Sequence, residues 1–174
     1  MNDGRYQLIA GGLLCVAINI TVNGIEACLP TFIGYILIAI GAFQMGAVQR
    51  WFRWSWPVAA ALATVSFPQM FQHATPPGSS IWAFYTWTWF PVVCMETLLV
   101  ILLIAGLAVE ADLRGNSRTR RLAWAGLPIL IAAVALWFLT LDLETDAGYL
   151  FNVLVYFLPQ FYLAGLFSYA SRGL

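Results

Sequence analysis

Residues 91–121 read PVVCMETLLVILLIAGLAVEADLRGNSRTRR, and this stretch decides the fold class. Residues 91–109 are apolar apart from Glu96 and Thr97. An apolar run of about 20 residues is long enough to cross the hydrocarbon core of a bilayer as an α-helix. Four arginines follow this run, and cytoplasmic loops are where positive charge is retained. The stretch therefore predicts a transmembrane helix that ends on the cytoplasmic side.

The composition of the whole chain predicts the same surroundings. Of its 174 residues, 61% are hydrophobic and 9% are charged, whereas a soluble domain carries about 25% charged residues. In lipid each helix satisfies its own backbone donors and acceptors, which an open sheet edge cannot do. We therefore expect an all-α, polytopic membrane protein, with residues 1–174 forming a single bundle of six transmembrane helices.

The apolar segments and the breakers between them give the boundaries of the six expected spans. We interpret the first apolar run as a retained helix and not as a cleaved signal peptide. Pro91 lacks the amide donor that a continuous helix needs, so we expect 81–90 to lie along the outer interface and the crossing to start near Pro91. The expected spans are Gln7 to Val22, Leu29 to Val48, Trp54 to Phe71, Trp82 to Val109, Leu122 to Leu141 and Gly148 to Ala170.

The positions of the arginines test the number of spans. With six spans, every arginine falls on one side of the membrane. The charged residues and histidine of the alternate loops are Glu26, His73 and the acidic residues of 142–146. Positive charge marks the cytoplasmic side, so both termini are expected there. The arginines are Arg5, Arg50, Arg53, Arg114, Arg118, Arg120, Arg121 and Arg172.

Residues 29–35 read LPTFIGY. This segment resembles small multi-pass bacterial inner-membrane proteins of unassigned function, which carry a similar Leu-Pro-x-Phe-Ile-Gly-Tyr segment near the N-terminus. The resemblance covers one helix. It implies localisation in the bacterial inner membrane as a multi-pass protein, and it implies no activity.

Several classes of function lack the residues they need. The chain has no lysine for a Schiff base, one histidine (His73) and three scattered cysteines, and no spacing typical of a metal site. Its net charge of zero gives no basic surface for nucleic acid. No catalytic triad, glycine-rich nucleotide loop or zinc helix is present, so an enzyme is not expected. A carboxylate enzyme acting on lipid stays open, as does the identity of any cofactor.

Glu96 is the ionisable residue that lies inside an expected span, and a carboxylate there predicts a functional site by default. The alternative is a structural hydrogen bond to a neighbouring helix. Other polar or aromatic side chains fall in the same outward half of the bundle, which predicts an outward-facing ligand pocket. The expected ligand-binding residues are Glu96, Asn19, Asn23, Gln69, Asn152, Tyr85 and Trp89.

Helix contacts in lipid depend on close packing, which small residues permit. The expected contact residues are Gly11 and Gly12, Gly34 with Gly41, Ala59 with Ala63, and Ala132 with Ala135.

These features lead to one functional hypothesis and two alternatives. The leading hypothesis is a membrane-embedded component that binds or transports a small solute. The first alternative is a non-catalytic accessory or structural subunit of a larger membrane complex. The second is a proton or ion path from Glu96, for which Gln44 and Gln160 are the few polar residues available toward the cytoplasm, so the aliphatic inner halves of the helices interrupt it. Beyond the lipid bilayer, the expected partners are other membrane subunits or a cytoplasmic partner at Arg114, Arg118, Arg120 and Arg121.

Overall fold

A computed structural model of the chain describes residues 3–18, 20–22, 25–28, 31–69, 80–140 and 146–173. Within these ranges the chain forms six helices and a short hairpin of two strands. The prediction of a helical bundle is confirmed. The helices are α1 (Asp3–Ala17), α2 (Thr31–Gly46), α3 (Arg50–Gln69), α4 (Ser80–Leu113), α5 (Ser117–Thr140) and α6 (Asp146–Gly173).

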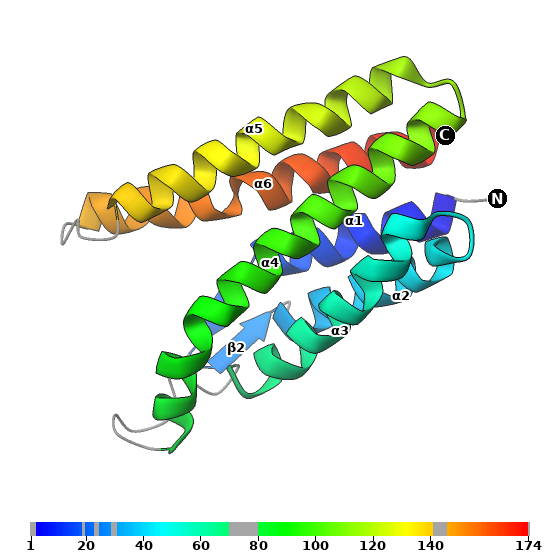
Figure 1. Ribbon diagram of the computed structural model, residues 1–174. Helices are drawn as coiled ribbons and strands as arrows, with labels where there is room; N and C mark the ends of the chain where they lie inside the picture. The colour runs from blue at the N-terminus through cyan, green and yellow to red at the C-terminus, as the bar shows by residue number, and fades with distance from the viewer. Residues whose placement is uncertain are drawn as a thin grey trace.

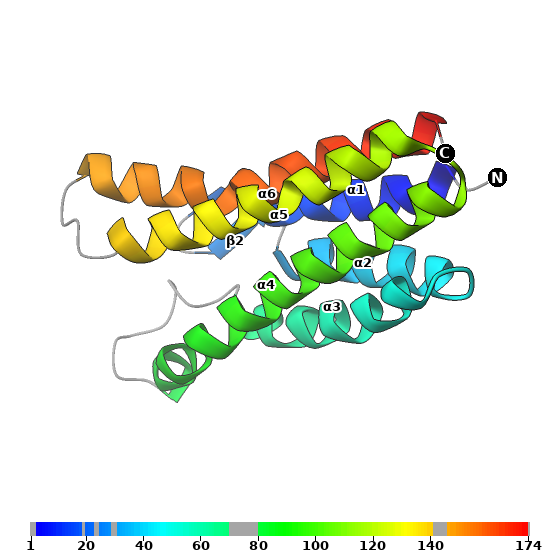
Figure 2. The ribbon, with the colours of Figure 1, turned by 45° about the horizontal axis from the view of Figure 1, so that its top comes forward.

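The helices pack as a ring in chain order. Each one contacts the next, and α6 returns to pack against α1. Figure 1 shows both ends of the chain at one end of the bundle, together with the turns between α2 and α3 and between α4 and α5. Seen from a second direction, α4 and α5 lie close at their shared turn and diverge toward the opposite end (Figure 2). Successive helices therefore run up and down.

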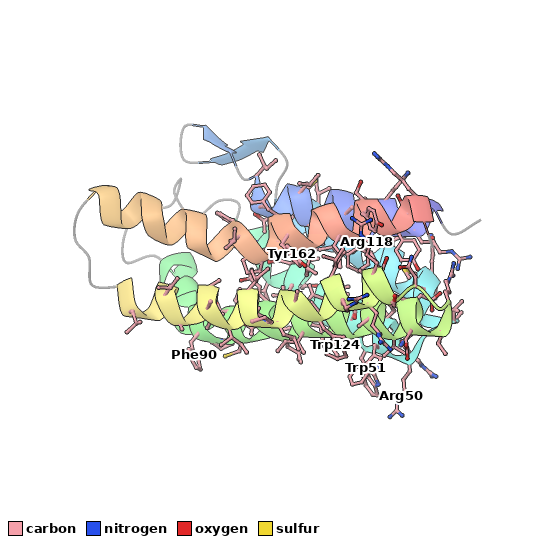
Figure 3. All side chains as sticks on the ribbon, turned by 90° about the horizontal axis from the view of Figure 1, so that it is seen from above. Arg50, Trp51, Phe90, Arg118, Trp124 and Tyr162 are labelled. Atoms are coloured by element: carbon pink, nitrogen blue, oxygen red, sulfur yellow. The ribbon has the colours of Figure 1, made fainter. Side chains whose placement is uncertain are left out.

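All eight arginines belong to the end of the bundle that holds the termini. They lie near the start of α1, at the start of α3, at the α4–α5 turn, in the first turns of α5, and near the end of α6. Figure 3 shows Arg50, Arg118, Trp51 and Trp124 in this half, with Phe90 toward the other. The predicted segregation of arginine to one end is confirmed. We call this the arginine end.

Two details of the predicted spans are wrong. The first span was expected to reach Val22, but α1 ends at Ala17, and β1 (Ile20–Val22) pairs antiparallel with β2 (Ile25–Cys28). β-Branched residues at 20–22 and 25 fit an extended pair better than a helix. The break expected at Pro91 is also absent, because α4 continues from Ser80 to Leu113 with this proline inside it.

Length and composition identify two of the described helices as able to cross a membrane. They are Phe90–Leu113 within α4 and Ser117–Leu136 within α5. The shorter α2 is also apolar.

The α1–α2 contact depends on glycine. A Cβ atom built on Gly12 would lie 2.5 Å from the carbonyl oxygen of Gly34, and one on Gly34 would lie 2.6 Å from that of Gly12. Gly41 approaches the backbone of Arg5 in the same interface. A Cβ atom built on Gly11, by contrast, would meet nothing within 4 Å. The small-residue prediction is therefore confirmed for Gly12, Gly34 and Gly41, whereas Gly11 makes no such close approach.

The turn between α4 and α5 is fixed by backbone and side-chain caps. Gly115 adopts a φ of 69°. Its N–H donates to the carbonyl of Asp112, and the N–H of Asn116 donates to that of Ala111, the pattern of a Schellman motif. The Asn116 side chain then accepts a hydrogen bond from the N–H of Thr119 and caps α5. Because the turn is capped on both sides, it holds the first residues of α5 beside the end of α4.

Candidate functional site

Glu96 lies in the interior of the helix ring, where side chains from four helices meet. It comes from α4, while Tyr35 comes from α2 and Gln160 from α6. Tyr35 is 2% exposed and Gln160 is 6% exposed. Leu13 and Val16 of α1 complete the apolar wall on one side. Three polar side chains from three helices thus converge within an otherwise apolar core.

One oxygen of the Glu96 carboxyl has a partner. The Tyr35 hydroxyl donates a hydrogen bond to Oε1 of Glu96. The second oxygen, Oε2, is buried and has no hydrogen-bond partner within the described part of the chain. A buried acceptor without a partner costs roughly 1–3 kcal/mol, and more when it is charged. Such a group in a folded protein calls for an explanation, which a bound water, proton or ion would supply.

Two small cavities adjoin Glu96. One of about 30 Å³ lies between α4, α5 and α6, and Glu96, Thr97 and Gln160 contribute its polar surface. The other, of about 10 Å³, lies between α1, α2, α4 and α6, where Tyr35 joins Glu96 and Gln160. A water molecule needs about 10–15 Å³ of such space. The cavities therefore fit water-sized guests on either side of the carboxyl.

Thr97 adds less to the site than its position suggests. Its Oγ1 donates to the backbone carbonyl of Val93, one turn earlier in α4, at 2.8 Å. This local bond occupies the hydroxyl hydrogen, so Thr97 offers only its lone pairs to the cavity. Glu96 and Gln160 are therefore the principal polar groups facing the larger cavity.

Charge is distributed unevenly along the bundle. The two ion pairs found among the described residues are Arg114 with Glu110 and Arg120 with Asp112. Both lie at the arginine end, whereas Glu96 is 14 residues earlier in α4 than Glu110, about 21 Å along the helix axis. Within the described structure, no cationic side chain offsets a charge on Glu96.

Most of the predicted ligand-binding side chains lie outside the part of the structure that is described. Asn19 and Asn23 lie outside the described residues. The backbones of Gln69, Tyr85, Trp89 and Asn152 lie in α3, α4 and α6, but their side chains lie outside what is described. Glu96 is the member whose side chain is described, and it lies between the helices of the ring.

The structure adds Tyr35 to the site and moves Gln160 into it. Tyr35 belongs to the LPTFIGY segment, and its signal was a polar hydroxyl within an apolar helix. Gln160 was considered only as a step toward the cytoplasm, but it lines both Glu96 cavities. Gln44, the other amide considered for that path, lines a separate groove between α2 and α3.

Comparison with known proteins gives no assignment: no family model, curated protein or solved structure matches this chain.

Proposed function

We propose that this chain is a membrane-embedded component that binds or transports a small solute, and that the solute is a proton or a small monovalent cation held at Glu96. The observation that carries the proposal is the buried Oε2 of Glu96, which has no hydrogen-bond partner among the described residues, in a side chain that lines two water-sized cavities.

The outer surface of the bundle supports membrane insertion. Soluble monomers rarely expose large contiguous apolar patches, yet exposed large hydrophobic side chains occur on every described helix. Several of them belong to α2, α3, α4 and α5, which are not the terminal helices of the chain. Among the most exposed are Phe43 (64%), Trp54 (58%), Phe67 (53%), Phe90 (58%), Ile131 (67%) and Leu139 (80%).

The prolines inside the helices also support membrane insertion. Prolines lie inside four of the described helices, at Pro57 and Pro68 in α3, Pro91 in α4, Pro128 in α5 and Pro159 in α6. A proline inside a soluble helix costs about 3 kcal/mol because it removes a hydrogen bond and clashes with the preceding turn. Transmembrane helices tolerate it more readily, because neighbouring helices satisfy the freed carbonyl.

The size of the cavities limits which solutes can bind beside Glu96. Pockets for organic ligands measure about 300–1,000 Å³, roughly 10 to 30 times the volume of the larger cavity beside Glu96, which measures about 30 Å³. A hydrated organic molecule does not fit there. A proton needs no additional volume, and a small cation occupies about the space of one water molecule.

The contacts of Glu96 indicate how such a site works. An ionised carboxylate in an apolar interior costs several kcal/mol unless it is paired. A proton or a cation at Oε2 removes this cost, while the Tyr35 hydroxyl holds Oε1 and fixes the orientation of the carboxyl. Gln160 lines both cavities, and its side-chain amide carries an oxygen, the type of ligand that hard monovalent cations prefer.

Infrared difference spectroscopy of the purified protein tests the proposal. We expect a protonated-carboxyl band that changes when pH is raised or when Li⁺, Na⁺ or K⁺ is added, and that disappears in Glu96→Gln. Glu110→Gln is the matched control, because Glu110 is a buried carboxyl of the same helix that is ion-paired with Arg114 at 2.6 Å. Circular dichroism verifies that both variants fold.

Persistence of the same band in Glu96→Gln contradicts the assignment to Glu96. A Glu96 band that responds neither to pH nor to any of the three cations leaves the residue with a purely structural role. Proton or cation flux into vesicles that contain the purified chain then separates transport from binding alone.

A second candidate function, a non-catalytic subunit of a larger complex, is favoured by a different feature. A groove of about 720 Å³ runs between α2 and α3, with Ala39, Ala60 and Ala63 among its lining residues. Edge-to-face aromatic pairs, Phe32 with Phe67 and Phe43 with Trp56, stand near its two ends. Native mass spectrometry after mild extraction distinguishes the candidates, because a subunit is recovered in an assembly of different chains.

A further inference from the structure

We infer that a pocket between α4 and α5 at the arginine end binds the phosphate headgroup of an anionic phospholipid; the inference rests on the membrane insertion proposed above. The pocket measures about 410 Å³ and is lined by Ala108, Val109, Asp112, Arg120, Arg121 and Trp124. We call it the α4–α5 pocket. It is distinct from the Glu96 site, because the two share no lining residue.

The four arginines of this region have different contacts, and these contacts select two of them. Arg114 donates to the buried Glu110 carboxylate. Arg118 stacks its guanidinium over the Tyr169 ring at 5.7 Å. Arg120 and Arg121 are the pair that lines the pocket. The predicted arginine cluster thus divides into residues that hold helices together and residues that face a cavity.

The lining has a net positive charge. Arg120 is paired with Asp112, which positions its guanidinium. Arg121 has no ion-pair partner among the described residues and is exposed. A guanidinium has five N–H donors, so Arg120 keeps donors beyond the one that Asp112 accepts. Two adjacent guanidinium groups, one of them without a counterion, are suited to bind a phosphate through two parallel hydrogen bonds.

The apolar part of the lining favours a lipid over a free phosphate. Ala108, Val109 and the Trp124 ring offer inorganic phosphate no hydrogen bonds, but they can contact the glycerol and the first methylenes of an acyl chain. Tryptophan is enriched at this depth of a bilayer, where its ring is half wet. Basic pockets between helices on the cytoplasmic side are typical binding sites for anionic headgroups.

The α5 N-terminus is not itself the anion site. The first turn of α5 is already capped, since Asn116 accepts from the N–H groups of Thr119 and Arg120. Side chains, and not free helix amides, are therefore the donors that the pocket offers. This makes the arginine side chains the right targets for substitution.

Lipid titration in detergent micelles tests the inference. Phosphatidylglycerol should raise the Tm of the wild-type chain, and phosphatidylcholine should raise it less, because a ligand that binds only the folded state stabilises it. Arg121→Gln should weaken phosphatidylglycerol binding roughly fivefold to tenfold. Arg50→Gln is the matched control, because Arg50 is an exposed arginine at the same end that does not line the pocket.

Three outcomes overturn the inference. The first is equal stabilisation by the two lipids, and the second is an equal loss of binding in Arg50→Gln and Arg121→Gln, which indicates general surface charge. The third is equal stabilisation by inorganic phosphate alone, which makes the site a phosphate site without lipid specificity. Flotation of both variants with phosphatidylcholine vesicles tests membrane insertion separately, so failure of the proposed setting is distinguishable from failure of the pocket.

Discussion

The adjacent glycines Gly11 and Gly12 should respond oppositely to the same substitution. Alanine at position 12 places a Cβ atom 2.5 Å from the Gly34 carbonyl oxygen, about 0.9 Å closer than the 3.4 Å at which ordinary contact begins. It also falls 2.7 Å from Cγ1 of Ile38, whereas a Cβ at position 11 meets nothing within 4 Å. Because the closest neighbour is backbone, α1 and α2 have to separate for Gly12→Ala to fit.

The magnitude follows from two terms. Replacing glycine by alanine inside a helix gains roughly 0.5–1 kcal/mol at either position, so this term cancels in the comparison. Overpacking of a close contact costs about 1–3 kcal/mol. For a chain of this size each kcal/mol shifts Tm by about 2–4 °C. Gly12→Ala should therefore unfold roughly 2–12 °C below Gly11→Ala.

Thermal unfolding of the two purified variants, followed by circular dichroism in the same detergent, measures this difference. Gly11→Ala should match or exceed the wild type. Gly34→Ala, which meets the Gly12 carbonyl oxygen at 2.6 Å, should behave like Gly12→Ala. Equal Tm values for Gly11→Ala and Gly12→Ala would refute the tight α1–α2 contact.

Two further substitutions test local features, each by the same thermal assay. Gly115→Ala should lower Tm by roughly 2–8 °C, because a left-handed residue with a Cβ costs about 1–2 kcal/mol; an unchanged Tm contradicts the turn geometry. Tyr162→Phe removes the hydroxyl that donates to the Leu122 carbonyl at 2.6 Å and should cost about 0.5–1.5 kcal/mol. Tyr169→Phe is its control, since the aromatic ring that Arg118 covers is retained.

The positions of the helices could be predicted from the sequence because each depends on a local pattern. Apolar runs of suitable length, punctuated by polar turns, locate all six helices to within a few residues, apart from the early end of α1. The segregation of the arginines was predictable too, because one turn carries several of them and alternate turns carry none. The hairpin of β1 and β2 was missed, since an apolar β-branched segment fits a helix and a strand alike when only hydropathy is considered.

Packing partners were less predictable, because small residues mark a possible contact without saying which face is used. Ala59 and Ala63 are buried as expected, whereas Ala132 and Ala135 are exposed. The difference between Gly11 and Gly12 has the same origin, since adjacent residues point about 100° apart around a helix. Only the rotation of α1 about its axis, which the rest of the bundle sets, decides which of the two meets α2.

The Glu96 site depends both on a local sequence pattern, which could be predicted, and on packing partners, which could not. A carboxyl within an apolar run is visible from the sequence, because its burial is costly wherever the helix packs. Its neighbours are not, since Tyr35, which donates to it, lies 61 residues earlier, and Gln160, which lines the same cavities, lies 64 residues later. Ring closure also bounds the cavities to the size of water, and that bound, more than the carboxyl itself, favours a proton or small cation over an organic solute as the species that Glu96 holds.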